Sequence, residues 1–198
     1  MFALWYTSFM KHTIGIGALF ENEAFNYIRS LELGIYEDTN DFKGLTQPPH
    51  VTVKRPFLVN DMTEIQYVDK IMQQVGHETQ SFSLELSSIK SFSKSVLYLN
   101  VEDNQILNDL HLRLIKTLSS KFPGSVDQFD GDGVIFHATI GMGMNKDSFN
   151  SASKLLKSKK IDILNKPIRI SKLGLFLALD DESQWVIISE TPLAKLKY

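Results

Sequence analysis

The chain has 198 residues, of which 43% are hydrophobic and 22% are charged, and its formal net charge is −2. This length and composition fit one globular domain with a sizeable core, while the near-neutral charge excludes the broad basic surface that grips duplex nucleic acid. The absence of cysteine excludes disulfides, thiolate nucleophiles and thiolate metal sites, and it fits a cytoplasmic protein.

Residues 1–10 are apolar, but they lack the basic start and the small-residue cleavage pattern of a secretion signal. We expect them to be an extension of a single domain that accounts for residues 1–198, with Met10 as an alternative start. No run approaches the roughly 20 apolar residues that span a bilayer, so we expect no membrane partner.

The first half of the chain alternates strand and helix patterns, judged by apolar spacing and by turn and cap residues. The expected elements are a strand over 13–20, a helix over 21–33 that Gly34 ends, an irregular segment over 35–47, a strand from His50 that Pro56 closes, a helix that Asp61 caps, and a strand over 81–89.

The second half follows the same order. The expected elements are a strand over 95–101, a helix capped by Asp103 or Asn104, an acidic loop over 127–133, a strand over 134–142, a helix that Asp147 caps, a strand over 167–179, a hairpin turn over 180–183 and a strand over 184–189. The long helix has a leucine stripe at Leu107, Leu110, Leu114 and Leu118.

The two halves therefore read as a repeat, with units over roughly 11–93 and 94–198. Residues 84–92 and 168–176 match in apolar pattern without a gap. A duplicated unit packed about a pseudo-twofold axis brings equivalent strands together, and ligands commonly bind in the concave site between two such lobes.

Each half contains one strand with the pattern His-x-Thr. His50 and Thr52 lie two positions apart, as do His137 and Thr139, and apolar residues separate and flank them. Because side chains alternate between the two faces of a strand, each His shares one face with its Thr. We expect the two polar faces to meet across one cleft and to form an active site.

His-x-Thr alone is a weak signal, since a third copy, His77-Glu78-Thr79, lies in a polar connection without apolar alternation. A buried, hydrogen-bonded histidine beside a good strand former is the alternative interpretation of each motif. The equivalent position of His50 and His137 in the repeat favours a shared site.

The paired motifs His50-Val-Thr-Val and His137-Ala-Thr-Ile, with their repeated context, resemble the 2H phosphoesterase superfamily and in particular its 2′-5′ RNA ligase-like branch. The resemblance covers the chain from about Lys11 onward. It implies a bilobal α+β fold in which two antiparallel-rich sheets face a central cleft and the helices lie outside.

The resemblance also implies metal-independent cleavage of a phosphodiester, typically a nucleoside 2′,3′-cyclic phosphate. Carried over by position, His50 and His137 are the acid–base pair, and Thr52 and Thr139 bind the phosphate. Two imidazoles suit proton transfer near neutral pH, and a hydroxyl can donate to the non-bridging oxygens. The sequence does not say which histidine is the base.

The chain departs from many relatives after the second motif, where Gly141-Met142-Gly143 replaces a glycine and a basic residue. Lys54 and Arg55 follow the first motif, and by alternation Lys54 shares a face with His50 and Thr52. They are candidates for substrate binding, with a solvated strand end as the alternative interpretation.

A metal site is the competing chemistry, since two histidines with a carboxylate can hold a divalent ion. Asp127, Asp130 and Asp132 precede the second motif, but they read as a solvated turn-rich loop, and no histidine pair has metal-ligand spacing. We expect no metal and no cofactor.

Recognition of a base depends on stacking aromatics. Phe57, Phe92 and Phe176 are candidates, with a core role as the alternative, whereas Trp185 has no assignable role beyond packing. We expect a monomeric, cytoplasmic enzyme whose partner is a small nucleotide or an RNA end carrying a cyclic phosphate. The alternative is a module that binds such an end without turnover, and a weaker one is hydrolysis of a non-RNA cyclic phosphate.

Overall fold

Two four-stranded antiparallel sheets form the centre of the molecule. The computed structural model describes residues 11–131, 133–179 and 184–195. The first sheet has the order β2-β1-β7-β8, from strands β1 (His12–Leu19), β2 (His50–Val59), β7 (Lys172–Leu179) and β8 (Gln184–Pro192). The second sheet has the order β5-β4-β3-β6, from strands β3 (Phe82–Phe92), β4 (Val96–Val101), β5 (His137–Gly141) and β6 (Pro167–Ile170).

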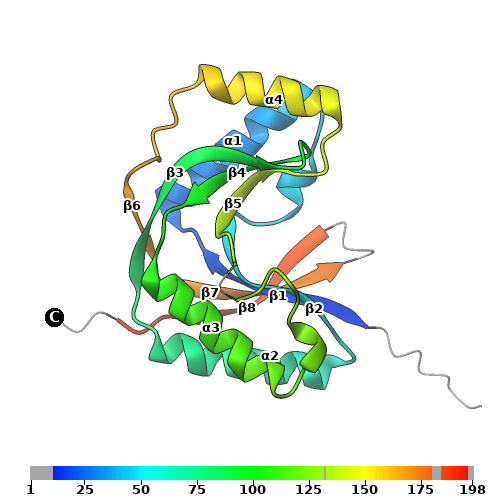
Figure 1. Cartoon of the computed structure of the whole chain (residues 1–198), viewed down its shortest axis with the longest axis vertical. Coiled ribbons are helices and arrows are strands. Elements are labelled where there is room, and N and C mark those ends of the chain that lie inside the picture. Colours follow the sequence, from blue (N-terminus) through cyan, green and yellow to red (C-terminus); the bar gives the residue numbers. More distant parts are fainter. Residues whose placement is uncertain (1–10, 132, 180–183, 196–198) are drawn as a thin grey trace, which may run out of the picture.

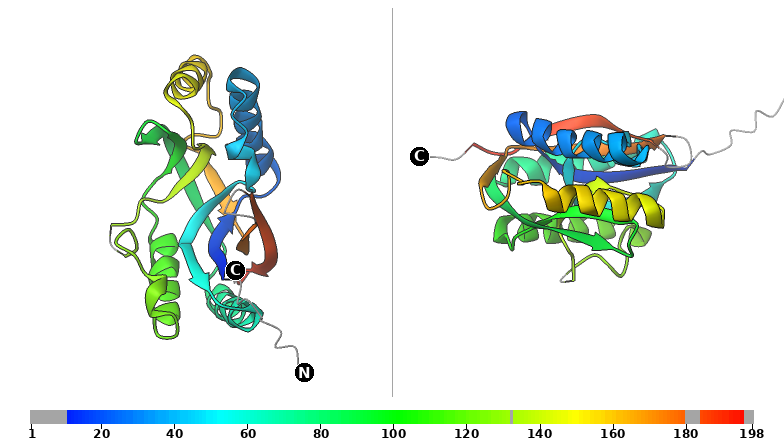
Figure 2. Two further views of the ribbon diagram at one scale, coloured as in Figure 1. Left: turned by 90° about the vertical axis from the view of Figure 1, so that its right-hand side faces the viewer. Right: turned by 90° about the horizontal axis from the view of Figure 1, so that it is seen from above.

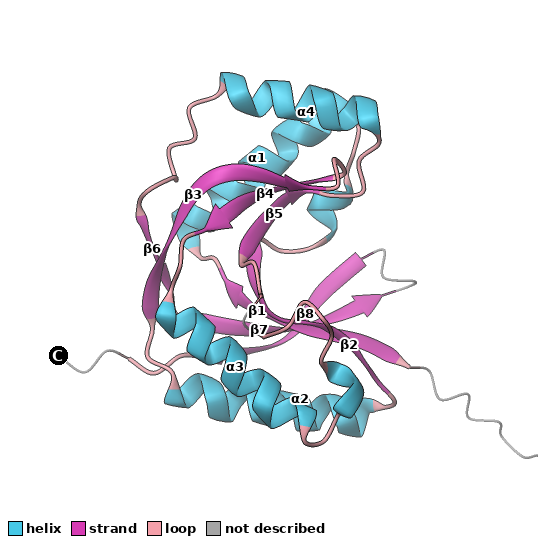
Figure 3. Cartoon of the chain, in the orientation of Figure 1, coloured by secondary structure: helices cyan, strands magenta, loops and turns pink. Residues whose placement is uncertain are grey.

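Four α-helices lie outside the two sheets (Figures 1 and 3). Helices α1 (Asn22–Thr39) and α4 (Lys146–Ser158) pack against the second sheet and lie side by side (Figure 2, right). Helices α2 (Met62–Glu78) and α3 (Gln105–Ser119) pack against each other and against the first sheet. Short 3₁₀ turns occupy Lys43–Thr46 and Pro123–Ser125. This arrangement confirms the expected α+β class.

The helices bury the stripes that the sequence predicted. Leucines 107, 110, 114 and 118 of α3 have no exposed surface. The Asn104 side chain accepts a hydrogen bond from the Leu107 N–H and so caps α3, and Asp61 caps α2 by accepting from the Glu64 N–H. No helix in the described part of the chain is long and apolar enough to cross a membrane.

The sheets do not follow the halves of the sequence. The first sheet takes β1 and β2 from the first half and β7 and β8 from the second, while β3 joins strands of the second half in the other sheet. The chain crosses from the second sheet to the first at Ser171, between β6 and β7. The first half therefore contributes one strand to the second sheet and the second half contributes two strands to the first sheet, and this exchange ties the two lobes together (Figure 2, left).

The predicted end of the first helix at Gly34 is wrong. The helix continues because Ile35 is buried on the same stripe as Ile28, and it ends only where Asn40 takes a left-handed conformation with φ 59°.

The predicted end of the second strand at Pro56 is also wrong. β2 is the edge strand of its sheet, where a proline is tolerated. The register between β1 and β2 shifts around this residue, between the pairs Ile14–Phe57 and Ile16–Lys54. The bulge lets the strand pass through the proline without losing its pairing partner.

Further boundaries differ from the expectation, since β3 ends at Phe92 instead of residue 89 and β8 ends at Pro192 instead of residue 189. β5 begins at His137 instead of residue 134, and Ser171 divides the predicted strand over 167–179 in two. Helix α4 is capped by Asn145, whose side chain accepts from the N–H groups of Asp147 and Ser148. The expected hairpin turn over 180–183 and the extension over 1–10 lie outside the described residues.

Candidate active site

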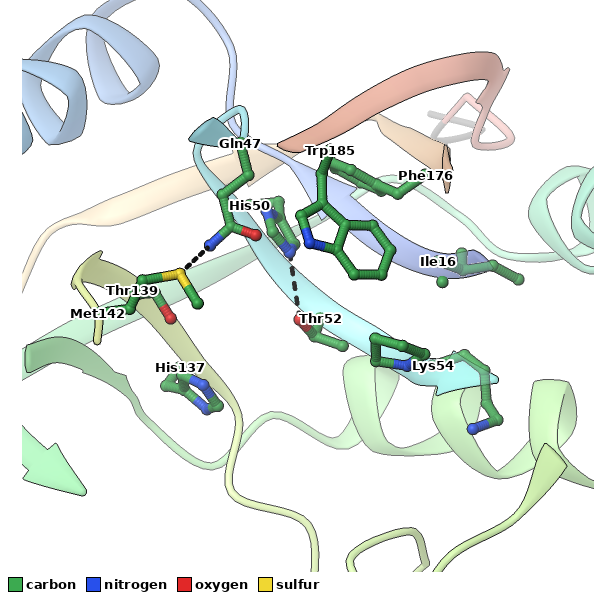
Figure 4. Close-up of a pocket in the computed structure, with 12 residues that line it drawn as sticks. Ile16, Gln47, His50, Thr52, Lys54, His137, Thr139, Met142, Phe176 and Trp185 are labelled. Atoms are coloured by element: carbon green, nitrogen blue, oxygen red, sulfur yellow. Dashed lines mark hydrogen bonds between the residues drawn. The ribbon is translucent and has the colours of Figure 1, made fainter. Parts of the chain in front are cut away.

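Both His-x-Thr strands face one pocket between the sheets. β2 and β5 are the edge strands of their sheets and pack against each other. The pocket between them has a volume of about 190 Å³, and His50, Thr52, His137 and Thr139 all line it (Figure 4). The strand exchange thus brings together four side chains that are far apart in the sequence.

Each histidine is held by the same local hydrogen bond. The Nδ1 atom of His50 lies 2.8 Å from the Pro48 carbonyl oxygen, and the Nδ1 atom of His137 lies 2.7 Å from the Ile135 carbonyl oxygen. A carbonyl oxygen only accepts, so Nδ1 carries the hydrogen in both rings. This tautomer leaves Nε2 of each ring as the atom that can take or give a proton in the cleft.

The hydroxyl of Thr52 adjoins the reactive nitrogen of its histidine. Thr52 Oγ1 lies 3.2 Å from His50 Nε2, which is hydrogen-bonding distance (Figure 4). Thr139 occupies the same place in the second motif and lines the opposite side of the pocket. A hydroxyl next to an imidazole can donate to an oxygen of the group to or from which the imidazole transfers a proton.

Burial shifts the pKa of both histidines downward. Desolvation lowers the pKa of His50 from 6.5 to about 4, opposed by the Pro48 carbonyl and aided by the charge of His137. Desolvation also lowers the pKa of His137, opposed by the Ile135 carbonyl and aided by the charge of Arg55. Both rings are therefore neutral in the free protein at pH 7, and the downward shift of the pKa is larger for His50.

Aromatic rings pack against each histidine in a repeated pattern. The His50 and Phe176 ring centroids are 4.5 Å apart, and those of His137 and Phe92 are 5.1 Å apart. Phe176 lines the pocket, whereas Phe92 does not. Phe57, the third candidate for stacking on a base, is 5% exposed and packs on Phe122 in the core. The core interpretation holds for Phe57.

Lys54 lines the pocket, yet its ammonium points away from the histidines (Figure 4). The register shifts between the pairs Gly17–Thr52 and Ile16–Lys54, so Lys54 lies opposite a residue of the buried core face. Its Nζ atom forms an ion pair of 2.9 Å with Asp130, and neither side chain has exposed surface. Lys54 thus lies on the pocket face with His50 and Thr52, as strand alternation predicted, but its ammonium is paired with Asp130.

The loop before β5 is anchored to β2 and is not simply solvated. Asp130 is buried, and its Oδ2 accepts hydrogen bonds from Lys54 and from the Asp127 N–H. Arg55, the other candidate cation, pairs with Asp127 at 2.9 Å and lies over the Phe129 ring. These contacts fix the segment that leads into His137 against the strand that carries His50.

A third histidine completes this anchor. His111 of α3 is fully buried, with Nδ1 2.6 Å from the Val53 carbonyl oxygen and Nε2 accepting from the Gly131 N–H. The accepting carbonyl assigns the hydrogen to Nδ1. His111 is therefore a satisfied structural histidine that links α3, β2 and the loop.

The sequence did not identify six residues of the pocket, of which three are Gly15, Ile16 and Pro56. The other three are Trp185 of β8, Gln47 and Met142. The Gln47 side-chain amide lies 3.6 Å from the Met142 sulfur, and this contact bridges the two sides of the cleft (Figure 4). The sequence feature that could have indicated Gln47 and Met142 is their closeness to the two motifs, since Gln47 directly precedes Pro48-Pro49 and Met142 follows shortly after Thr139.

The carboxylates near the site do not assemble with the histidines. Among the residues that the structure describes, no group of three His, Asp or Glu side chains is placed to hold a metal ion. Asp132, one of the three acids considered as oxygen donors, lies outside that part of the chain.

Sequence comparison gives one family match. A family model described as "2'-5' RNA ligase superfamily" matches residues 21–176. The chain is 27% identical over 142 residues to a "Putative phosphoesterase" of Oceanobacillus iheyensis, covering 71% of this chain and 76% of the relative. It is 25% identical over 150 residues to another protein of that description from Halalkalibacterium halodurans, covering 75% and 81%.

Solved structures share the fold at low sequence identity. TT0787 of Thermus thermophilus matches with a TM-score of 0.64 and 9% identity, covering 92% of this chain and 98% of that one. LigT of E. coli without ligand matches with a TM-score of 0.59 and 11% identity, covering 93% and 98%. LigT in complex with 3'-AMP matches with a TM-score of 0.55 and 10% identity, covering 92% and 98%.

Proposed function

The chain belongs to the 2′-5′ RNA ligase superfamily, as the doubled His-x-Thr motif predicted, and we propose that it is a phosphodiesterase that hydrolyses nucleoside or RNA 2′,3′-cyclic phosphates or 2′-5′ phosphodiester bonds. Two relatives described as phosphoesterases support the class of reaction. The complex of LigT, a protein of similar fold, with 3'-AMP supports a nucleotide as substrate.

One observation carries the proposal. Two histidines on strands from different sheets line one pocket. The Nδ1–H group of each histidine donates a hydrogen bond to the carbonyl oxygen of the residue two positions earlier in the chain. A structural histidine has no need to leave a nitrogen facing a polar pocket, as His111 illustrates by using both of its nitrogens in the core. The repeated geometry presents two proton-transfer groups to one substrate atom.

Hydrolysis in this site needs two proton transfers. His50, neutral because burial lowers its pKa to about 4, takes a proton from water as the oxygen attacks phosphorus. The bond from phosphorus to one ribose oxygen breaks, and protonated His137 gives that oxygen a proton. The product is a phosphomonoester with a free neighbouring hydroxyl.

The negative charge of the substrate favours the protonated form of His137, which takes its proton from the solvent. Negative charge within about 4–6 Å raises the pKa of an imidazole, which opposes the burial that lowers the pKa of His137 in the free protein. Thr52 and Thr139 donate to the non-bridging oxygens, where charge increases in the transition state. No step of this mechanism is assigned to a metal ion.

The lining of the pocket favours a substrate with a single charge. Its polar groups are imidazoles, hydroxyls and the Gln47 amide, and its lysine is paired with Asp130. A cyclic phosphodiester is a monoanion, whereas a polyphosphate chain brings several charges that need cations. We therefore propose that the phosphate group hydrolysed in this pocket is a cyclic or linear diester and not a phosphoanhydride.

All four motif residues come from one chain, which supports a monomer of residues 11–198 as the catalytic unit. The lack of cysteine fits a reducing compartment such as the cytoplasm. The extension over 1–10 is assigned no part in the reaction.

Turnover of adenosine 2′,3′-cyclic phosphate and of a 2′-5′-linked dinucleotide, in the presence of EDTA, tests the proposal. We expect His50→Ala and His137→Ala each to lower kcat by about 10²–10⁴-fold. His77→Ala is the matched control, because His77 belongs to the third His-x-Thr copy and is exposed in the last turn of α2, and it should keep the wild-type rate. Equal rates in all four proteins would refute the assignment.

A binding module without turnover is the second candidate, and the commitment of Lys54 to Asp130 is the observation that favours it. A pocket whose lysine is neutralised by a carboxylate stabilises a dianionic transition state less well than one with an unpaired ammonium. Saturable binding of the cyclic nucleotide with no product from any diester would establish this alternative.

A further inference from the structure

The two sides of the cleft are built on equivalent strands, but their side chains differ. In the first sheet Gly17 of β1 pairs with Thr52, and in the second sheet Tyr98 of β4 pairs with Thr139. The next cleft-facing position is Gly15, which pairs with Phe176, and its equivalent is Val96, which pairs with Phe92. The pseudo-twofold axis thus relates two glycines to a tyrosine and a valine.

The side chains of the second sheet fill the space beside His137. The Tyr98 ring stacks on Phe92 with centroids 4.3 Å apart, and it contacts the His137 ring at 5.0 Å. Tyr98 is 4% exposed, and neither it nor Phe92 lines the pocket. On this side of the cleft, the rings of Tyr98 and Phe92 therefore occupy the space next to His137.

The first sheet leaves the corresponding space open. Gly15 and Phe176 line the pocket on the His50 side. A Cβ atom at Gly17 would lie 2.8 Å from the His50 ring, so no side chain fits there. The three atoms nearest to a Cβ atom at Gly15 would be backbone atoms of Lys54 and Pro56, at 3.4 Å or more. Because Gly15 lines the pocket and has no side chain, the pocket extends to the strand backbone on this side.

An extra strand places an indole at this open side. β8 extends the first sheet beyond β7, and Trp185 pairs with Ala178 there. In the second sheet β3 is followed by β6, which pairs only with the first residues of β3, so no described strand occupies the place of Trp185. Trp185 lines the pocket on the same side as His50 and Phe176 (Figure 4).

The indole is not used by the fold as a bonding partner. Within the described part of the chain, the indole side chain of Trp185 makes no hydrogen bond and no aromatic or cation contact, in contrast to the ring of Phe176, which packs on His50 at 4.5 Å. A large flat side chain at the wall of an open polar pocket is a stacking surface for an unpaired base.

We propose that Trp185 stacks on the nucleobase of the substrate, above Gly15 and on the His50 side of the cleft. This inference rests on the proposed function, since it orients the same cyclic phosphate between the same histidines. Because only one side of the pseudo-symmetric site is open, the substrate enters in one of two otherwise equivalent orientations. The site then selects nucleoside cyclic phosphates over the same group without a base.

A comparison of two substrates tests the selectivity. Adenosine 2′,3′-cyclic phosphate and 1-O-methylribose 2′,3′-cyclic phosphate carry the same reacting group, and only the first has a base. We expect the wild-type kcat/KM to favour the nucleoside by about 10-fold to 100-fold. Trp185→Ala should remove most of this preference through KM, Trp185→Phe should keep most of it, and Gly15→Val should reduce it by filling the space.

Trp5→Phe is the control for loss of a tryptophan, and it should keep the preference. The same ratio of kcat/KM for the two substrates in the wild type and in Trp185→Ala would overturn the proposal. A loss of rate on both substrates alike in Trp185→Ala would do so too, since it would show a structural role.

A binding measurement separates this inference from the proposed function. In Trp5→Phe protein Trp185 is the sole tryptophan, so its emission reports its own surroundings. Adenosine 2′-monophosphate and adenosine 3′-monophosphate should quench it with saturation, and inorganic phosphate should not. Quenching without turnover would support the stacking site and refute the phosphodiesterase activity. Turnover without quenching would support the phosphodiesterase activity and refute the stacking site. Neither quenching nor turnover would refute both.

Discussion

Lys54 and Asp130 form an ion pair of 2.9 Å in which neither side chain has exposed surface. The pair joins β2, which carries His50, to the loop that leads into His137. Burial lowers the pKa of the Lys54 ammonium, and Asp130 opposes this shift by hydrogen bonding and charge. The two histidines thus have their relative position fixed by a contact that lies outside the reaction.

Removing one partner of this pair should destabilise the protein. Lys54→Met leaves a buried carboxylate without its counter-ion, and we expect the free energy of unfolding to fall by about 3–5 kcal/mol in urea titrations. Lys172→Met is the matched control, because Lys172 pairs with Glu190 at 3.2 Å with both side chains partly exposed, and it should cost less than about 1 kcal/mol.

The double variant Lys54→Met/Asp130→Leu should recover most of that loss, since it leaves no unpaired charge in the interior. Equal losses in Lys54→Met and Lys172→Met would contradict a buried pair.

The pH dependence of kcat/KM should place the optimum on the acid side of pH 6.5. This parameter reports the free enzyme, in which the base His50 is neutral above its pKa of about 4. His137 must be protonated to act as the acid, and burial lowers its pKa below 6.5. As the pH increases, kcat/KM should therefore rise near pH 4 and begin to fall below pH 6.5.

The kcat profile, which reports the complex, should lie at higher pH because the phosphate raises both pKa values. In His137→Ala the residual rate should lose the fall on the alkaline side. An optimum of kcat/KM above pH 8 would contradict this assignment of roles.

Gly17→Ala should lower activity without unfolding the protein. Its Cβ atom would lie 2.8 Å from the His50 ring and 2.9 Å from the Phe176 ring, and the bond to the Pro48 carbonyl leaves the imidazole little freedom to move. A displacement of about 1 Å in a reacting group can cost about 100-fold, so we expect kcat to fall by about 10-fold to 100-fold.

Gly124→Ala is the control, because a Cβ atom there meets nothing within 4 Å and Gly124 does not line the pocket. Its kcat should stay close to that of the wild type. A Gly17→Ala protein with unchanged kcat would show that the His50 ring is not held in place by its neighbours.

The two threonines should matter less than the two histidines. Thr52→Val and Thr139→Val each remove one hydrogen-bond donor to a charged oxygen, and we expect kcat to fall by about 10-fold to 100-fold. Thr52→Ser and Thr139→Ser keep the hydroxyl and should retain most of the rate. If serine and valine variants were equally slow, the methyl group and its packing would be the important feature.

The sequence predicted those features that depend on local periodicity. Strand alternation places His50 with Thr52 and His137 with Thr139. The repeat placed Phe92 and Phe176 at equivalent positions, and in the structure each of them packs on a histidine of the pair. The leucine stripe of α3 is buried as expected. These patterns need no knowledge of which strands pair.

Features that depend on pairing could not be predicted. The ammonium of Lys54 pairs with Asp130 because the loop before β5 packs on β2, and strand alternation cannot anticipate this long-range contact. Trp185 was assigned to packing because nothing in the chain shows that β8 joins β7 at the open side of the cleft. Gly17 and Tyr98 gained their meaning only when both were found opposite a threonine of the motif.

The central claim is that both imidazoles act on one phosphorus atom in one step. The most direct test is kcat for adenosine 2′,3′-cyclic phosphate in His50→Ala, in His137→Ala and in the double variant, with EDTA present. Residues that act as a unit are strongly non-additive, so the double variant should be about as slow as either single variant. A full wild-type rate in either single variant, or losses that multiply in the double variant, would contradict the claim.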